Sequence, residues 1–442
     1  MKTKFLMSTV LAGLTALSVP AFAGGEPAGS GMGASKGSSP QVVNSLADAF
    51  KNGKAYIDAR YRYETVDDST TGITQDGEAS TLRTRVGFTT AKFYNLQGSL
   101  EMENVSQLGD EDYDDGSNSK TTYGKVADPE GSELNQAWLS FDGVPATTIK
   151  YGRQVLNLGN QRFIGSVGWR QNDQTFDAVT LTNNSVKDTE LFYGYSYNVN
   201  RISGSNASGA TAAFNGDIHM LNANYSGLGF GKVGLYGYWL DLENSPANSS
   251  QTIGANFVGS YDIGSGAKAL YDLEFAQQSD YGDNTNSYDA NYWKVEPGIS
   301  WNGLTAKAGM EVLGADVAGD AGRVFSTPLA TLHKWNGWAD RFLATPAGGL
   351  EDKYGSIGYK LSGVHEYLDG TKFTVVYHDY SVSEGSGDIG NEWDYDVTQT
   401  VFGNYTVGVK YANYTGETTV PTTALSSDVD KLIFTFGVKF SQ

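Results

Sequence analysis

Arginines two positions apart are the first feature of this sequence that could do chemistry. Arg60 and Arg62 form one such pair, and Arg83 and Arg85 form a second. Residues two apart on a β-strand point to the same face, and a planar guanidinium group binds carboxylates bidentately. We predict that seven arginines line a water-filled pore and bind anions: Arg60, Arg62, Arg83, Arg85, Arg153, Arg162 and Arg170.

Two glutamates share this spacing on the next predicted strand, residues 94–106. Glu101 and Glu103 are expected to face inward and to oppose the arginines. Opposed rows of acid and base create a transverse field across a pore, and rows of arginine favour anions. The alternative is that inward charges pair with each other and only solvate the interior, as in any wide barrel. The sequence leaves both interpretations open.

Two segments between predicted strands are unusually aromatic. The first, residues 156–173, contains Phe163 and Trp169. The second, residues 315–350, contains a predicted constriction loop with Lys334, Trp335, Trp338, Asp340 and Arg341. Exposed loops with so many rings would form a sticky patch. We therefore expect both segments to fold into the interior and narrow it; the alternative is an ordered cap on the rim, packed by its own side chains.

The sequence contains few residues that could form a catalytic site. There are four histidines, and on the predicted strands His378 and Asp379 are the one adjacent pair of histidine and carboxylate. Neighbours on a strand point to opposite faces, so these two cannot form a dyad without a bulge. The chain has no cysteine, which removes thiolate metal sites and disulfides. We predict no enzyme activity and no cofactor.

An acidic stretch, Gly109 to Gly116, resembles a calcium loop only at its start. Asp110, Asp112 and Asp114 have the right spacing, but Asp115 stands where the turn glycine belongs and Thr121 where the bidentate glutamate belongs. Divalent cations that bridge these acids to lipid head groups are one interpretation. A solvated run of charge is the preferred one, and no metal site is predicted.

Alternation with period two is the dominant pattern from residue 54 to the C-terminus. The last segment shows it best, with apolar residues on one parity and polar residues on the other; the apolar set is Leu432, Phe434, Phe436, Val438 and Phe440. Eighteen such segments follow one another, joined alternately by long and short connections. This pattern predicts an all-β fold: an 18-stranded antiparallel transmembrane β-barrel with short periplasmic turns and long external loops.

The N-terminal residues predict export. Residues 1–23 combine Lys2 and Lys4, an apolar run and a small-x-small site, which is typical of a cleaved signal peptide. Residues 24–53 are expected to form a flexible mature N-terminus with one short periplasmic helix, and residues 54–442 the barrel. The expected partners are outer-membrane lipid and lipopolysaccharide, periplasmic chaperones and the barrel-assembly machinery. A net charge of −19 argues against nucleic acid.

Two blocks of the sequence resemble the alginate-export family of outer-membrane porins. They are YGRQVLNLGNQRFIGSVGWRQNDQTFDAV, from Tyr151 to Val179, and STPLATLHKWNGWADRFLATPAGGLEDKY, from Ser326 to Tyr354. The resemblance implies an eighteen-stranded barrel with an arginine-lined pore that conducts an anionic polysaccharide. By position it assigns Arg153, Arg162 and Arg170 to the pore lining, and Lys334, Asp340 and Arg341 to a loop near it.

These observations lead to one expected function and two alternatives. We expect a passive channel in the outer membrane for a polar or anionic solute, with an acidic polysaccharide, another anionic glycan or an organic acid as the candidates. A general diffusion porin without a dedicated substrate is the first alternative. A structural barrel of a cell-surface complex is the second.

Overall fold

The computed structural model describes residues 42–109, 111–417 and 425–442. The predicted signal peptide, most of the predicted flexible N-terminus and Asp110 of the acidic stretch lie outside these residues. Within them, twenty strands form one sheet, and two of these, β1 (Val42–Val43) and β4 (Lys92–Phe93), are short and pair with each other in parallel.

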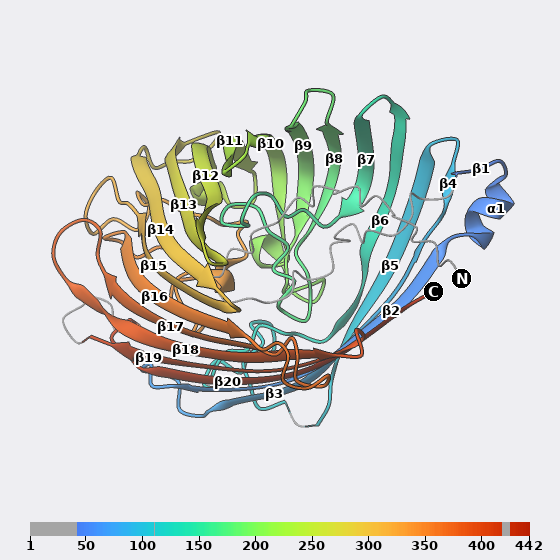
Figure 1. The fold of residues 1–442 in the computed structure, drawn as a ribbon. Coiled ribbons are helices and arrows are strands. Elements are labelled where there is room, and N and C mark those ends of the chain that lie inside the picture. The colour runs from blue at the N-terminus through green and yellow to red at the C-terminus, as the bar shows by residue number, and fades with distance from the viewer. Residues whose placement is uncertain (1–41, 110, 418–424) are drawn as a thin grey trace, which may run out of the picture.

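The other eighteen strands form a closed antiparallel barrel (Figure 1). Each pairs with its neighbours in the chain, and closure comes from the pairing of the first barrel strand with the last. The strands are β2 (Lys54–Asp68), β3 (Gly77–Thr89), β5 (Leu96–Gln107), β6 (Gly131–Val144), β7 (Thr147–Gln154), β8 (Thr175–Asn183), β9 (Thr189–Asn200), β10 (Ala213–Leu228), β11 (Gly231–Leu242), β12 (Ser250–Gly264), β13 (Ala267–Asp280), β14 (Asp289–Trp301), β15 (Leu304–Leu313), β16 (Leu350–Lys360), β17 (Lys372–Ser381), β18 (Asp388–Val401), β19 (Tyr405–Gly416) and β20 (Val429–Ser441). The predicted fold and strand count are confirmed.

The two faces of the wall differ as the alternation predicts. On β2, the even-numbered residues Arg60, Arg62 and Glu64 are buried. Ile57, an odd-numbered residue of the same strand, is 45% exposed. Large apolar side chains are likewise exposed on other strands, for example Leu235 and Ile253. In a closed barrel the apolar exposed face is the outer one, which lipid covers, and the polar face is the inner one.

A short helix precedes the barrel. Ser45 is the N-cap of helix α1 (Leu46–Lys51), and its hydroxyl accepts a hydrogen bond from the backbone N–H of Asp48 at 3.0 Å. The sequence predicts one short helix within residues 24–53, and the helix occupies only the part of that range between β1 and β2. Among the described residues, no helix is long and apolar enough to cross a membrane.

Long connections at one end of the barrel alternate along the chain with short turns at the other end. One departs from the predicted pattern: the turn between β16 and β17 runs from Leu361 to Thr371, although its end of the barrel otherwise carries the shorter turns. The carboxylate of Asp369 orders this turn by accepting the backbone N–H groups of Gly363 and Val364 at 2.9 and 2.8 Å. At the opposite end, residues 155–174 (the first segment) and 314–349 (the second segment) are long connections that carry the predicted constriction residues.

Candidate functional site

The first and second segments pack against each other. The Gly165 backbone N–H donates to the Leu329 carbonyl at 2.9 Å, and the hydroxyl of Thr331 accepts the backbone N–H of Val167 at 3.1 Å. Arg162 adds a side-chain contact, because its Nη2 donates to Asn336 Oδ1 at 3.0 Å. The two predicted constriction segments therefore form one continuous structure.

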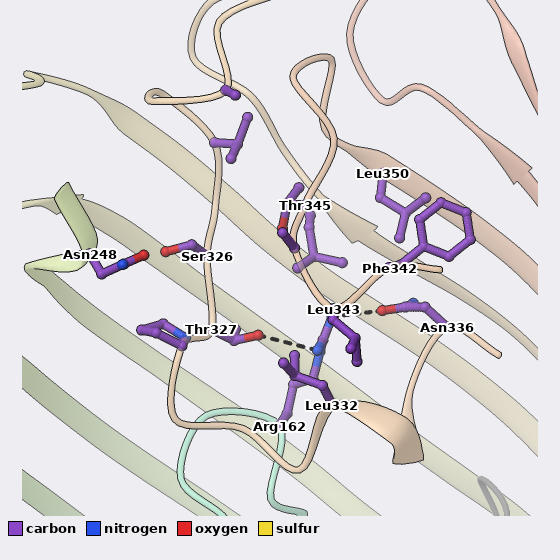
Figure 2. Close-up of a pocket in the computed structure, with 15 residues that line it drawn as sticks. Arg162, Asn248, Ser326, Thr327, Leu332, Asn336, Phe342, Leu343, Thr345 and Leu350 are labelled. Carbon is purple, nitrogen blue, oxygen red and sulfur yellow. Dashed lines mark hydrogen bonds between the residues drawn. The ribbon is translucent and has the colours of Figure 1, made fainter. Parts of the chain in front are cut away.

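Arg162 also ties this structure to the barrel wall. Its Nε lies 2.9 Å from Glu311 Oε1 on β15, and the side chain is only 1% exposed. Figure 2 shows Arg162 at one end of a cavity of about 140 Å³, with Thr327 and Asn336 beside it. The cavity lies between the second segment, Asn248 of η2 (Pro246–Asn248) and the ends of β15 and β16.

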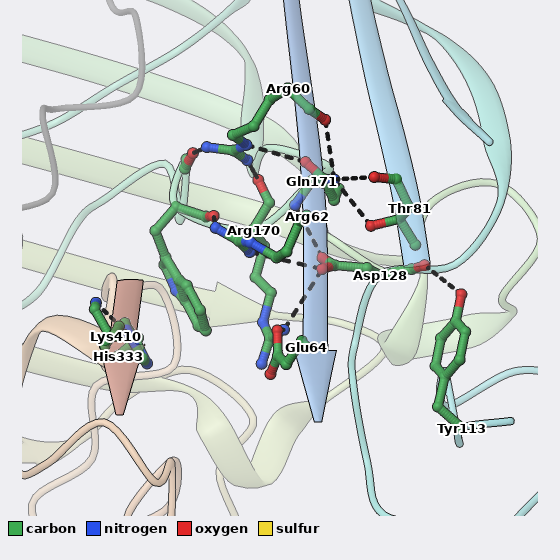
Figure 3. Close-up of polar contacts among 12 residues, drawn as sticks. Arg60, Arg62, Glu64, Thr81, Tyr113, Asp128, Arg170, Gln171, His333 and Lys410 are labelled. Atoms are coloured by element: carbon green, nitrogen blue, oxygen red, sulfur yellow. Dashed lines mark hydrogen bonds and ion pairs between the residues drawn. The ribbon is translucent and has the colours of Figure 1, made fainter. Parts of the chain in front are cut away.

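The arginines of β2 hold the first segment by its backbone. Arg60 Nη1 donates to the Gly168 carbonyl at 3.0 Å, and Arg62 Nη2 donates to the Trp169 carbonyl at 2.5 Å (Figure 3). Arg60 Nε donates to Gln171 Oε1 at 3.0 Å. These predicted pore-lining side chains contact a loop folded against the inner face of the wall.

The arginines of β3 pair with carboxylates on the adjacent strands, and Arg85 also pairs with one in the first segment. Arg83 Nη2 lies 2.6 Å from Asp58 Oδ1, and Arg85 pairs with both Glu103 and Asp173. The register places Arg85 directly opposite Glu103 on the adjacent strand. Arg85 and Glu103 therefore form a contact along one wall, where the sequence suggested a field across the pore.

The remaining predicted acid and arginine are also paired. Glu101 accepts hydrogen bonds from Tyr56 and from Asn135 Nδ2, the latter at 2.6 Å. Arg153 on β7 makes a bidentate pair with Asp177 on β8, with distances of 2.7 and 3.0 Å. Arg153 is thus paired with a residue of the adjacent strand, and it has no contact with Arg170 or the partners of Arg170 described below.

Arg170 joins three parts of the chain. Its Nη1 lies 2.9 Å from Glu64 Oε2 on β2 and 3.5 Å from Asp128 Oδ2 in the connection between β5 and β6. Its Nη2 lies 3.2 Å from Asp340 Oδ2 in the second segment. Burial would raise the pKa of Asp128, but Arg170 and Arg62 hold that pKa below its ordinary value. Arg170 is the centre of the charge network in Figure 3.

His333 lies between this network and Lys410 on β19. Its Nδ1 is 2.7 Å from Asp340 Oδ1 and its Nε2 is 3.0 Å from Lys410 Nζ, while its ring stacks on Trp169. Burial, followed by the charge of Lys410, lowers the pKa of His333 to about 3. The ring is neutral at pH 7, so Nδ1–H donates to Asp340 and Nε2 accepts from Lys410.

Asp340 is correspondingly held as an anion. Burial alone would raise its pKa, but Lys431, whose Nζ is 2.8 Å from Oδ2, and the other cationic contacts hold the pKa well below its ordinary value. Next to it, Arg341 reaches Asp68 at 3.3 Å and Thr70 at 3.3 Å, at the end of β2. The predicted constriction residues Asp340 and Arg341 therefore fasten the second segment to the wall.

The turn at Asn336 and Gly337 presents backbone N–H groups to acids on β18. Trp338 N–H donates to Asp394 Oδ2 at 3.2 Å, and Ala339 N–H donates to Glu392 Oε1 at 2.6 Å. Gly337 has a φ of +88°, a left-handed conformation that glycine adopts without strain, and a Cβ there would overlap Glu392. Only glycine permits this close approach.

Lys334 and Trp335 have a different environment. Lys334 Nζ donates to the Asn160 carbonyl at 2.9 Å, and in the described part of the chain it has no carboxylate within ion-pair distance. The Trp335 ring lies 5.5 Å from Lys334 Nζ and 5.0 Å from Lys294 Nζ. Burial, followed by the repulsion of Lys294, lowers the pKa of Lys334 to about 8.

Sequence reasoning missed the partners that hold these residues. They lie on inner faces of distant strands or in connections: Asp128, Glu311, Glu392, Asp394, Lys410 and Lys431. Strand parity marks those on the strands as inward-facing, but it cannot show which loop residue each one meets. Among the described residues, no group of three or more histidines and acids has the geometry to hold a metal ion.

Comparisons with known proteins agree with this architecture. A family model described as Alginate export matches residues 54–327, which include the block from Tyr151 to Val179 and only the start of the block at Ser326. A comparison with curated protein sequences found no match.

Solved structures with the same fold include three porins. Pseudomonas aeruginosa OccK9 (OpdG) has a TM-score of 0.69 at 15% identity, over 89% of this chain and 100% of its own. P. aeruginosa OpdK, solved with vanillate, has a TM-score of 0.67 at 13% identity, over 89% and 100%. Acinetobacter baumannii OccAB2 has a TM-score of 0.67 at 14% identity, over 89% and 99%. At these identities the likeness shows the fold.

Proposed function

Since the chain belongs to the alginate-export family of outer-membrane porins, we propose that it is a passive channel for a small polar or anionic solute. The first and second segments form its constriction. The observation that carries this proposal is the position of Arg170, which ties both segments to the inner face of β2 through Glu64 and Asp340. A loop fastened inside a barrel narrows the path that remains.

In this proposal the arginines position the constriction, and a lysine sets its charge. Arg60, Arg62 and Arg162 are at most 9% exposed and are engaged by loop carbonyls or carboxylates. Lys334 is partly exposed and lacks a carboxylate partner among the described residues, so its charge is available to a passing anion. A weak preference for anions follows.

A carboxylate is the solute class that this charge pattern favours. The vanillate in the OpdK structure is itself a small carboxylate bound by a porin of the same fold, which supports an organic acid as a candidate. An acidic polysaccharide remains the alternative that the family resemblance suggests. Because the two segments are in direct contact and would narrow the path, an organic acid fits this proposal better than a polysaccharide.

A general diffusion porin is the second candidate. The pairing of inner-face charges favours it, because Arg85 with Glu103, Lys294 with Asp272 and Lys307 with Glu296 cancel each other locally. A barrel with balanced walls selects by size more than by charge.

Planar bilayer recordings test these candidates. We expect the folded wild type to conduct KCl and to give a reversal potential that indicates anion preference. Lys334→Gln should abolish the preference, and Lys353→Gln should leave it unchanged, since the Lys353 side chain is 54% exposed and pairs with Glu351 at 2.6 Å, away from the constriction. Conductance without selectivity in the wild type would favour the general porin. A barrel that conducts no current would reject both candidates.

A further inference from the structure

We propose that the cavity beside Arg162 is a binding site for a single-ring carboxylate of the size of benzoate. The proposal deepens the proposed function and rests on it for its role, because it gives the channel a capture site at the end of the barrel with the long connections. The site is formed by the second segment, Asn248 and the adjoining ends of β15 and β16 (Figure 2).

The polar part of the cavity is suited to a carboxylate. Arg162 is buried and has three acceptors in the structure: Glu311 at 2.9 Å, Asn336 at 3.0 Å and Thr327 at a long 3.4 Å. A guanidinium group carries five N–H donors, so donors remain for a ligand. The hydroxyl groups of Ser326 and Thr327 also line the cavity. Although Glu311 already pairs with Arg162, the remaining N–H donors and the neighbouring residues Ser326 and Thr327 offer hydrogen bonds to one carboxylate.

The rest of the lining is suited to a ring. The buried side chains of Leu313, Val324, Phe342 and Leu350 form apolar walls. An engineered cavity of roughly 150 Å³ lined by such residues holds one benzene molecule, so the 140 Å³ measured here matches one ring and excludes a chain of sugars. A ring with one carboxylate satisfies both parts of the lining.

The cavity opens to solvent at an apolar rim. Leu343 is 51% exposed at this rim, and Ala321 and Ala344 beside it are also exposed. Leu343 and the two alanines therefore give the opening an apolar edge that a ring can contact on entry. On its other side, Arg162 lies 5.5 Å from the Trp335 ring, so the proposed site is next to the constriction residues Lys334 and Trp335.

Ligand-observed NMR on the full barrel folded in detergent tests the proposal, with benzoate as the probe. Benzamide keeps the ring without the charge, and acetate keeps the charge without the ring. We expect benzoate to bind at least tenfold more tightly than either, because each comparison compound loses one part of the lining. Equal binding of benzoate and benzamide would overturn the assignment of Arg162.

Two variants and one matched control locate the site. Ser326→Leu fills the cavity and keeps the main-chain hydrogen bonds of Ser326 with Gln278, and Leu343→Asp places a negative charge at the rim. Each should weaken benzoate binding at least tenfold. Val317→Asp changes an exposed residue of the same segment outside the cavity and should bind benzoate as the wild type does. Circular dichroism and heat-dependent gel mobility verify that each variant is folded.

The outcomes separate this proposal from the proposed function. A folded Ser326→Leu barrel that binds benzoate like the wild type would overturn the site. A wild type that conducts current but does not bind benzoate would overturn the site and leave the channel standing. A wild type that binds benzoate but conducts no current would overturn the channel and leave the site standing.

Discussion

At the residue scale, the arginines in this barrel act mainly as anchors. A buried guanidinium is costly unless it has hydrogen-bond or charge partners, and here loop carbonyls and carboxylates supply many of them. Arg170 is the extreme case, because Glu64, Asp128 and Asp340 all approach it from different parts of the chain. An arginine whose charge is shared by three carboxylates has little freedom to bind a passing anion.

Replacing Arg170 tests this anchoring role. Arg170→Ala leaves three buried carboxylates without their shared cation, and breaking a buried ion pair costs about 3–5 kcal/mol. We expect a loss of stability of that size in urea unfolding of the folded barrel. Arg323→Ala is the control, since its pair with Asp320 is 39% and 46% exposed and is worth about 0–1 kcal/mol. Equal losses in the two variants would contradict the anchoring role.

Lys334 predicts a pH-dependent selectivity. Its pKa of about 8 means that the ammonium is charged at pH 6.5 and mostly neutral at pH 9.5. Anion preference in planar bilayers should therefore decline as the pH rises through 8. Lys334→Arg should keep the preference at pH 9.5, because arginine stays protonated there. A wild-type preference that is the same at both pH values would show that another group sets the selectivity.

At the element scale, the constriction depends on the close approach of the first and second segments. A Cβ at Gly165 would overlap the hydroxyl of Thr331 and lie 2.9 Å from its backbone nitrogen. Gly165→Ala should push the segments apart at a cost of about 1–3 kcal/mol and increase both single-channel conductance and proteolysis within the segments. Gly229→Ala, where the new Cβ meets nothing within 4 Å, should change neither. Unchanged conductance in Gly165→Ala would show that this contact does not limit the path.

The strands were predictable from sequence, but the contacts between the segments were not. Alternation is a local pattern, which is why β14 begins and ends at the predicted residues, Asp289 and Trp301. The pair of Arg170 with Asp340 joins residues 170 positions apart, and no local pattern specifies it. Glu103 shows the same limit in the wall itself, because its pairing with Arg85 depends on the strand register.

At the scale of the whole molecule, closure makes the alternating pattern meaningful. Because β2 pairs with β20, no strand of the barrel has an open edge, and every wall residue faces either the interior or the surroundings. The interior contains the charged side chains of the inner face of the wall and of the first and second segments. The exterior carries exposed apolar and aromatic side chains, such as Phe230, which is 49% exposed and whose ring centroid lies 6.0 Å from that of Phe257 near the short-turn end. The barrel was predictable for this reason, whereas the family was predicted from the two sequence blocks that resemble it.

A charge on the outer face tests the membrane position of the barrel. Leu273 lies near the middle of β13, is 41% exposed and pairs with Phe257 and Val295 on the adjacent strands. Arginine at the bilayer midplane costs about 2–4 kcal/mol in such barrels. Leu273→Arg should lower the unfolding free energy in lipid by that amount, whereas Val186→Arg, in a turn where valine is 54% exposed, should change it little. If Leu273→Arg folds in lipid with wild-type stability, this part of the wall does not face hydrocarbon.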